Sequence, residues 1–371
     1  MESPPGAETV IDGRRFLYFA GSSYLGLHGH PEVIEAACDA LRAHGLHTAT
    51  GRENPPLVDV AEAAVRFFDT SSALYVGSGY GSNSVVADAL EATFDAVFVD
   101  ELAHYSVRDA TLLSGRPVHV YASRDVGSLA EVLRRHLGPG DRPLVMTDGV
   151  FPDFGWVAPV SGYIEVLTDY PGAALCLDDS HSFGILGENG RGTFEHAGLW
   201  RRCAESSPDD TSGIRLFVCG TLSKAMGGFG GLVPGSEGVV QAARDRSRYW
   251  RGSASPTAPA AAATATAMEF VRMNPELREQ LRYNIRAVRQ GLRDLGLDVA
   301  DLPTANVAVQ VGDAENMARI SCELEERGII VPYFSDYSDI PKGDGCLRIA
   351  VFATHTPDMI ERLLETLSTL L

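Results

Sequence analysis

The sequence predicts an α/β fold in which a mostly parallel sheet is followed by a small α+β C-terminal domain. Seven short apolar runs, rich in β-branched and aromatic residues, recur through the first two thirds of the chain. Their hydrophobicity is continuous rather than alternating, which is typical of parallel strands buried on both faces. Helical patterns lie between several runs, and this alternation indicates a layered core. The predicted strands are 73–76, 96–100, 117–122, 143–149, 174–178, 216–220 and 230–235.

The helices are predicted where apolar residues recur at helical spacing. In the first part of the chain the clearest segments are 82–93, 127–137 and 157–168. After about residue 250, an alanine-rich segment and a long amphipathic segment predict two more helices. A strand–helix–strand–strand–helix order then predicts a compact α+β unit. These C-terminal segments are 256–271, 275–296, 306–311, 314–328, 329–334, 346–352 and 357 onward.

The composition favours a soluble enzyme over a nucleic-acid or membrane protein. The chain has 371 residues, of which 45% are hydrophobic and 22% charged, as in ordinary globular domains. The formal net charge of −18 disfavours binding to phosphate backbones or anionic lipid surfaces. The first ten residues have neither a basic nor a long apolar segment, so we expect no secretory signal, and the apolar stretches are too short to span a membrane. Six cysteines without a CxxC pair predict reduced thiols, so we expect a cytoplasmic protein.

The first candidate site surrounds Lys224, in the segment LFVCGTLSKAMGGFGG. This lysine follows a predicted buried strand and precedes a glycine-dense stretch. Among Ala, Met and Gly residues it loses hydration, which lowers its pKa and frees the neutral amine to form a Schiff base. Thr221 and Ser223 supply the small hydroxyl groups that a phosphate needs. A lone lysine is usually a surface residue on a loop, and the glycines and hydroxyls here argue against that alternative.

The second candidate site is the segment ALCLDDSHSFG. Asp178 ends a buried strand, where open α/β sheets place ligand-binding groups. A carboxylate there can hold a pyridinium nitrogen protonated, which makes the ring an electron sink. His181, three residues later, can reach a neighbouring ring substituent. A metal site that includes Asp179 is the alternative, but the sequence has no second His, Cys or Glu cluster to complete it, so we expect no metal.

The third candidate site is the glycine-rich turn of residues 77–83, between a predicted strand and a predicted helix. The backbone amides and the dipole of such a helix N-terminus suit a phosphate group. The turn also resembles a dinucleotide-binding fingerprint, with Asp100 near the position of a ribose-binding acid. However, a nicotinamide cofactor would leave Lys224 and Asp178 unexplained.

Two further side chains are candidates for ligand contacts. Arg348 lies in an otherwise apolar strand, and a buried arginine needs an anion. Either a substrate carboxylate or a carboxylate of the protein can serve. His104 follows the end of a predicted strand. Its imidazole can stack on a cofactor ring, or it can be an ordinary loop histidine.

Taken in order, these segments resemble the α-oxoamine synthase family of fold-type I enzymes, which use pyridoxal 5'-phosphate (PLP). The motifs DELAHYS, LDDSHSFGILGENGRG and GTLSKAMGGFGG carry the resemblance, which runs from about residue 18 to the C-terminal helix. It implies an N-terminal segment at 1–45, a large PLP-binding domain at 46–255, with a seven-stranded sheet, and a small domain at 256–371. It also implies a homodimer with shared active sites.

The resemblance implies a PLP-dependent acyltransferase that condenses a small amino acid with an acyl thioester, bound to CoA or to a carrier, with decarboxylation expected. The main alternative keeps the cofactor but changes the reaction to that of an aminotransferase, decarboxylase, aldolase or racemase. A third hypothesis is a catalytically silent partner subunit, and the presence of Lys224 argues against it.

The resemblance also assigns roles by position. Lys224 would form the Schiff base and Asp178 would pair with the pyridine nitrogen, while His181 would approach the phenolic oxygen and His104 would stack on the ring. Residues expected to hold the phosphate are Ser78, Gly79, Tyr80, Gly81 and Thr221, together with Ser253 from a second subunit. Residues expected near the substrate carboxylate are Arg348 and Ser22.

Three positions depart from the family pattern. Ser22 stands where the family has an asparagine near the substrate carboxylate, and Pro152 stands where it has a serine near the cofactor. Leu57 occupies the position of a histidine, in a stretch (47–60) that replaces a glycine-rich one. The cofactor chemistry tolerates these changes, whereas the amino acid and the acyl donor do not follow from the resemblance.

Overall fold

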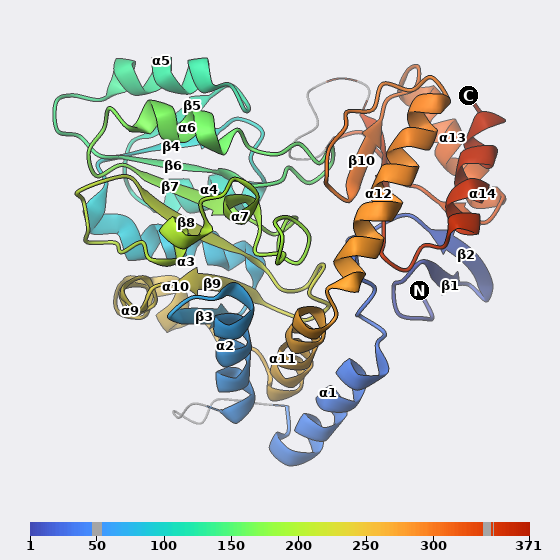
Figure 1. Ribbon diagram of the computed structural model, residues 1–371, viewed down its shortest axis with the longest axis horizontal. Helices are drawn as coiled ribbons and strands as arrows, with labels where there is room; N and C mark the ends of the chain where they lie inside the picture. The colour runs from blue at the N-terminus through green and yellow to red at the C-terminus, as the bar shows by residue number, and fades with distance from the viewer. Residues whose placement is uncertain (47–53, 337–342, 344) are drawn as a thin grey trace.

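The computed structural model describes residues 1–46, 54–336, 343 and 345–371. The start of the stretch 47–60 therefore lies outside the described residues. A seven-stranded sheet forms the centre of the larger part of the molecule, at the left of Figure 1, with the strand order β3-β9-β8-β7-β6-β4-β5. All seven predicted strands are confirmed. They are β3 (Ser72–Val76), β4 (Ala96–Asp100), β5 (Val118–Tyr121), β6 (Pro143–Asp148), β7 (Ala174–Asp178), β8 (Arg215–Thr221) and β9 (Gly231–Gly235).

The sheet is parallel except at β9, which runs antiparallel to both β3 and β8. The central strands β6, β7 and β8 are buried along their whole length, which explains their continuous hydrophobicity. Successive residues of β7 contribute to different cores, because side chains alternate between the two faces of a strand. Leu175 and Leu177 belong to one apolar cluster and Cys176 to another.

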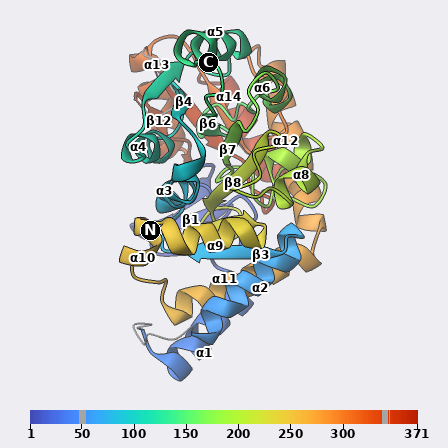
Figure 2. The same cartoon turned by 90° about the vertical axis from the view of Figure 1, so that its left-hand side faces the viewer.

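Helices cover both faces of this sheet (Figure 2). Side chains of α3, α4 and α9 pack in the cluster on one face, and those of α5, α6 and α8 pack on the other. The predicted helices 82–93, 127–137 and 157–168 correspond to α3, α5 and α6. The helical segments up to residue 252 are α1 (Pro31–His44), α2 (Pro55–Phe68), α3 (Gly79–Leu90), η1 (Glu91–Thr93), α4 (Tyr105–Leu113), α5 (Val126–His136), α6 (Val160–Leu167), α7 (Thr193–His196), α8 (Trp200–Ala204), α9 (Glu237–Arg246) and α10 (Arg248–Gly252).

The C-terminal part contains two small sheets at the right of Figure 1. One is antiparallel, with the order β10-β13-β12. The other has the order β1-β2-β11 and joins the two ends of the chain, because the N-terminal hairpin pairs in parallel with β11. The elements are β1 (Glu8–Ile11), β2 (Arg14–Tyr18), α11 (Ala258–Met273), α12 (Glu276–Asp294), β10 (Asn306–Val309), α13 (Ala314–Glu326), β11 (Ile329–Ile330), β12 (Tyr333–Phe334), β13 (Cys346–Ala350) and α14 (Pro357–Ser368).

The predicted strand 329–334 is correct only in part. The structure divides it into β11 and β12, which belong to different sheets. The break falls at Val331 and Pro332, and proline cannot donate a hydrogen bond to a continuing ladder.

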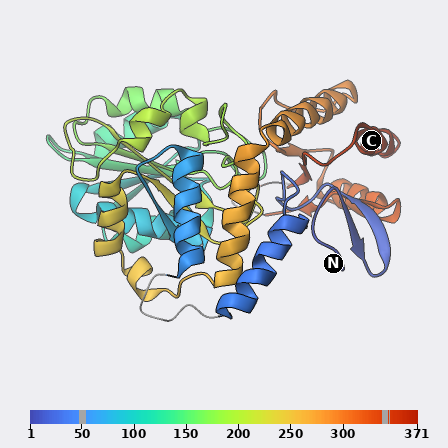
Figure 3. The ribbon, with the colours of Figure 1, turned by 60° about the horizontal axis from the view of Figure 1, so that its bottom comes forward.

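Helix α11 lies between α1 and α2 (Figure 3). The domain boundaries at 45 and 255 remain a prediction. Among the described residues, no helix is both long and apolar enough to cross a membrane.

Candidate active site

The candidate residues gather at one edge of the large sheet. The neighbouring strands β4, β6, β7 and β8 run parallel and end at Asp100, Asp148, Asp178 and Thr221. Asp148 and Asp178 are direct partners in the register of β6 and β7. The carboxyl ends of parallel strands form the usual ligand-binding edge of an open α/β sheet. The loops that follow these strands bring Lys224, His181 and His104 to the same edge.

Lys224 lies in the tight connection between β8 and β9. The turn closes through a hydrogen bond from Gly227 N to Lys224 O of 3.0 Å, and Gly227 has a φ of +64°. A Cβ atom at residue 227 would lie only 2.4 Å from Cβ of Leu27, so the loop requires glycine there. The glycines of this motif therefore shape the loop that carries the lysine.

The amine of Lys224 contacts His181 within a poorly hydrated environment. Its Nζ lies 2.8 Å from Nε2 of the buried histidine. Loss of hydration lowers the pKa of Lys224 to about 8, against the opposing effect of the Asp178 carboxylate. Burial and the neighbouring Lys224 charge lower the pKa of His181 well below its usual range. With this pKa about a tenth of the amine is neutral at pH 7, far more than for an ordinary lysine, and the neutral amine is the form that acts as a nucleophile.

Asp178 is a buried carboxylate whose two oxygens are both held by hydrogen bonds. Oδ1 accepts from the backbone N of Ser180 at 3.0 Å. Oδ2 accepts from Nδ2 of Asn83 at 2.6 Å and from Oγ of Ser106 at 3.4 Å. The carboxylate is therefore fixed in orientation at the end of β7. The sequence does not identify Asn83 and Ser106 as partners of Asp178, although both lie within or next to its motifs.

His104 is held in place by its own backbone and ring. Its N–H donates to Oδ2 of Asp148 at 2.6 Å, and its Nδ1 lies 2.7 Å from Oγ of Ser106. The histidine also caps α4 by accepting from the backbone N of Ser106. Burial lowers the pKa of His104, so the ring is neutral at physiological pH. A fixed neutral ring suits the stacking role that the sequence predicts.

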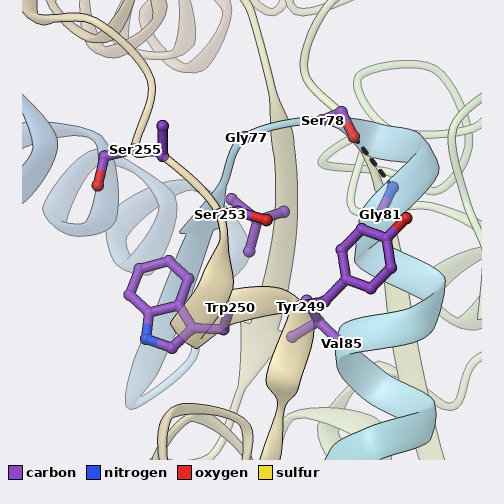
Figure 4. A pocket seen from close by; sticks show the side chains of 10 residues that line it. Gly77, Ser78, Gly81, Val85, Tyr249, Trp250, Ser253 and Ser255 are labelled. Carbon is purple, nitrogen blue, oxygen red and sulfur yellow. Dashed lines mark hydrogen bonds between the residues drawn. The ribbon is translucent and has the colours of Figure 1, made fainter.

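The N-terminus of α3 forms a cradle suited to a phosphate. Ser78 caps the helix by accepting from the backbone N of Gly81 at 3.1 Å (Figure 4). A Cβ atom at Gly79 would lie 2.4 Å from Cβ of Thr221, so only glycine lets the helix approach that threonine. Oγ1 of Thr221 lies 2.7 Å from Oγ of Ser223. These groups combine helix-terminal amides with hydroxyl groups, which is the chemistry that binds phosphate.

Ser253 and Tyr80 lie at the outer side of this cradle. Ser253 lines a cavity of about 160 Å³ with Gly77 and Ser78 of the same chain (Figure 4). Its contact across a subunit interface remains a prediction. Tyr80 is exposed, its hydroxyl donates to Oδ2 of Asp109, and its ring lies edge-on to His104 at a centroid distance of 6.1 Å.

Arg348 has a carboxylate of the protein beside it. The guanidinium Nε donates to Pro152 O at 3.0 Å and lies 3.4 Å from Oδ1 of Asp153. The side chains of Arg348 and Asp153 are 11% and 1% exposed. One guanidinium edge is therefore occupied by the loop after β6, while Nη2 lies 3.5 Å from the hydroxyl of Tyr24. The sequence does not identify Asp153 as the partner of Arg348, because nothing near Asp153 in the chain indicates a contact about two hundred residues away.

Ser22 is half-buried and lies two residues before Tyr24, on the same loop. Its place next to a substrate carboxylate remains a prediction.

Asp179 does not join Asp178 and His181 in a metal-binding group. Its two oxygens accept from the backbone N and from Oγ1 of Thr193, at 2.8 and 2.6 Å. Among the described residues, no group of three or more His, Cys, Asp or Glu side chains could hold a metal ion.

This arrangement fits PLP. The edge holds a lysine with a lowered pKa, a buried carboxylate fixed by hydrogen bonds, a neutral histidine and a helix N-terminus where a Cβ atom would fill the cradle. These are respectively suited to the aldehyde, the pyridine nitrogen, the ring face and the phosphate.

Comparisons with known proteins agree with this fit. Residues 15–367 match the family described as aminotransferase class I and II. The 8-amino-7-oxononanoate synthase of Trichlorobacter lovleyi is 36% identical over 367 residues, covering 97% of this chain and 90% of that protein. The corresponding enzyme of Nitrosococcus oceani is 35% identical over 372 residues, covering 99% of this chain and 94% of that protein.

Solved structures show the same similarity. A serine palmitoyltransferase from S. paucimobilis with bound PLP and myriocin covers 100% of this chain and 91% of its own, with 27% identity and a TM-score of 0.89. An 8-amino-7-oxononanoate synthase structure from Francisella tularensis shares the fold, with a TM-score of 0.78 at 22% identity, and covers 95% of this chain and 97% of its own.

These similarities extend over nearly the whole chain and confirm the fold type, the cofactor and the reaction class predicted from the sequence. The chain belongs to the α-oxoamine synthase family, the PLP-dependent enzymes that condense an amino acid with an acyl thioester.

Proposed function

We propose that this enzyme joins a small amino acid to an acyl thioester, carried by CoA or by a carrier protein, with loss of the amino-acid carboxylate. The observation that carries the proposal is the meeting of Lys224, Asp178 and Arg348 at one edge of the site. Nζ of Lys224 lies 2.8 Å from His181, which lies 2.8 Å from the Tyr24 hydroxyl, and that hydroxyl lies 3.5 Å from Nη2 of Arg348. The Asp178 carboxylate raises the pKa of the same lysine and the Arg348 charge lowers it. A single bound amino acid could thus contact both a reactive amine and a guanidinium.

The proposed roles follow from the chemistry of each group. When bound, PLP supplies an aldehyde to the lysine and a pyridinium ring that delocalises negative charge from the substrate. Lys224 holds the cofactor and moves protons at Nζ, and Asp178 keeps the ring nitrogen protonated. His104 covers the ring and excludes water from it. The N-terminus of α3, with Thr221, binds the phosphate, and Arg348 binds the substrate carboxylate at its Nη edge.

We also propose a homodimer in which Ser253 contacts the phosphate of the neighbouring subunit. Exposed aromatic side chains near the site support this proposal, because exposed apolar groups that gather in one place commonly mark an interface. Tyr249 is 42% exposed and lies against Gly81 at the cradle. Tyr80 is exposed on the same helix terminus.

All six cysteines are free thiols, which supports a reducing, cytoplasmic compartment.

Asp153→Asn should lower the KM for the amino acid by about threefold to tenfold, because it removes a negative charge that competes with the substrate for Arg348. The amide oxygen can still accept from the guanidinium, so the position of the arginine is retained. The substitution should also lower the pKa of Lys224, since the Asp153 carboxylate raises that pKa. Steady-state kinetics at varied amino-acid concentration would measure the first effect. An increased KM would instead mean that the charge of Asp153 is needed to hold Arg348.

The reaction is tested by carbon dioxide release from a panel of carboxyl-labelled amino acids, with and without acyl-CoA. Release that requires the thioester is the expected result, and it would also identify the amino acid. Release without the thioester would indicate a simple decarboxylase. If PLP and the amino acid bind but no label is released with any thioester, decarboxylative condensation is wrong.

A further inference from the structure

Both ring nitrogens of His181 lie within hydrogen-bonding distance of polar groups of other residues. Nδ1 lies 2.8 Å from the hydroxyl of Tyr24 and 3.2 Å from Nδ2 of Asn306. On the other side of the ring, Nε2 lies 2.8 Å from Nζ of Lys224. A neutral imidazole carries its proton on one nitrogen only, so these neighbours determine which nitrogen it is.

The Asn306 amide is oriented so that it can only donate toward His181. Asn306 is fully buried at the start of β10. Its Nδ2 donates to the carbonyl oxygen of Pro152, which fixes the NH₂ end of the amide on that side. The same NH₂ group faces Nδ1 of His181. Because an amide nitrogen cannot accept a hydrogen bond, this contact favours an unprotonated Nδ1.

Tyr24 reinforces the same arrangement. Burial raises the pKa of its hydroxyl to about 12, so the hydroxyl keeps its proton at physiological pH. The Arg348 guanidinium, 3.5 Å from the hydroxyl oxygen, can only donate to it. The hydroxyl proton of Tyr24 is then available to Nδ1 of His181. The donors thus point in one direction, from the arginine through the tyrosine to the histidine, as in a cooperative hydrogen-bond chain.

We propose that Asn306 is a positioning residue which, with Tyr24, holds His181 in the tautomer that carries its proton on Nε2. In this tautomer the Nε2 proton points at Lys224, so the amine accepts it in its neutral form. Because the pKa of Lys224 is lowered to about 8, this neutral amine predominates above pH 8. The inference rests on the proposed roles of Lys224 and His181, and it adds the group that sets their protonation. Once Lys224 holds PLP, the same Nε2–H is available to an oxygen acceptor such as the phenolic oxygen.

The test is direct observation of the tautomer in the full-length protein labelled with ¹⁵N-histidine, both with and without PLP. Multiple-bond ¹H–¹⁵N spectra distinguish a protonated from an unprotonated ring nitrogen, and the His181→Asn variant identifies the resonances by their loss. We expect an unprotonated Nδ1 and a protonated Nε2 in both forms at pH 9, where the Lys224 amine is mostly neutral. A protonated Nδ1 in the wild-type protein would overturn the proposal without any need for a variant at residue 306.

Asn306→Asp is the complementary variant, since it puts an acceptor in place of the donor at nearly constant shape. The proton of His181 should move to Nδ1, and Nε2 should become an acceptor for an ammonium group on Lys224. Asn316→Asp, the same chemical change on the remote helix α13, should leave the His181 resonances unchanged. If Asn306→Asp folds with the original tautomer, Asn306 has no positioning role. Because the readout needs neither substrate nor turnover, it stands apart from the test of the proposed reaction.

The protonation state of Lys224 supplies a second readout. The chain contains only two lysines, Lys224 and Lys342. A Lys342→Arg protein labelled with ¹³C-lysine therefore shows a single side-chain resonance, whose titration without PLP gives the pKa of Lys224. We expect this pKa to be higher in Asn306→Asp and unchanged in Asn316→Asp. An unchanged value in both would contradict the link between residue 306 and the amine.

Discussion

Replacing Lys224 by alanine should abolish covalent attachment of PLP and reduce turnover by on the order of 10³-fold or more, because the nucleophilic amine and the proton carrier are lost together. Truncation removes the contact of Nζ to Nε2 of His181, but the buried Asp178 carboxylate keeps its hydrogen bonds from Asn83, Ser106 and Ser180, so the fold should be retained. Borohydride reduction followed by peptide mass spectrometry would locate the attached cofactor.

The chain offers an unusually clean control for this experiment. Lys342 is the only other lysine, and it lies outside the described residues. Lys342→Arg should retain a reducible adduct on Lys224 and near-normal activity. A reducible adduct that persists in Lys224→Ala would show that the assignment of the Schiff-base lysine is wrong.

The pH dependence of cofactor capture is a further consequence of the same residue. With a pKa of about 8, about a tenth of the Lys224 amines are neutral at pH 7, and this fraction rises to a plateau above pH 9. The rate at which the protein without cofactor captures PLP should rise in parallel. A lysine at its ordinary pKa of 10.5 would show no plateau in that range.

Asp178→Asn should lower kcat by about 10²- to 10³-fold, because it removes the fixed charge that stabilises a protonated ring nitrogen as negative charge develops on the substrate. In one of its two orientations, the new amide would also place its own NH₂ group against the NH₂ group of Asn83, where neither nitrogen can accept a hydrogen bond. Saturating PLP should not restore kcat. An N-methylated PLP analogue should restore part of it, since its ring carries a permanent positive charge and needs no proton.

The neighbouring residue provides the matched control. Asp179 is also buried, but its oxygens bind Thr193 rather than facing the candidate site. Asp179→Asn should therefore lower the melting temperature and leave kcat close to the wild-type value. If Asp178→Asn keeps kcat within about threefold of the wild type, Asp178 does not serve as the partner of the ring nitrogen, since loss of such a stabilising group costs far more.

The amino-acid sequence alone determined the main sheet and the cofactor chemistry. Six of the strands were predicted because they are buried over nearly their whole length and are therefore continuously apolar. The edge strand β5, where Val120 is exposed, was found instead from its β-branched and aromatic residues. Lys224, Asp178 and the turn at 77–83 were found because each follows a strand end in a recognisable motif. Helices such as α1 and α2 were missed. Both begin with proline and pack on α11, a partner from the other end of the chain.

Only the tertiary structure decided the contacts around the substrate end of the site. Asp153 and Arg348 lie 195 positions apart in the sequence, and the chain positions of Asn306 and Tyr24 differ from that of His181 by 125 and 157. Nothing local in the sequence relates such residues, because their proximity arises only when the loops after β2, β6 and β7 meet β10 and β13 in the folded protein. A motif can thus indicate which residues react, while the proton positions and the charge balance depend on neighbours that folding brings together.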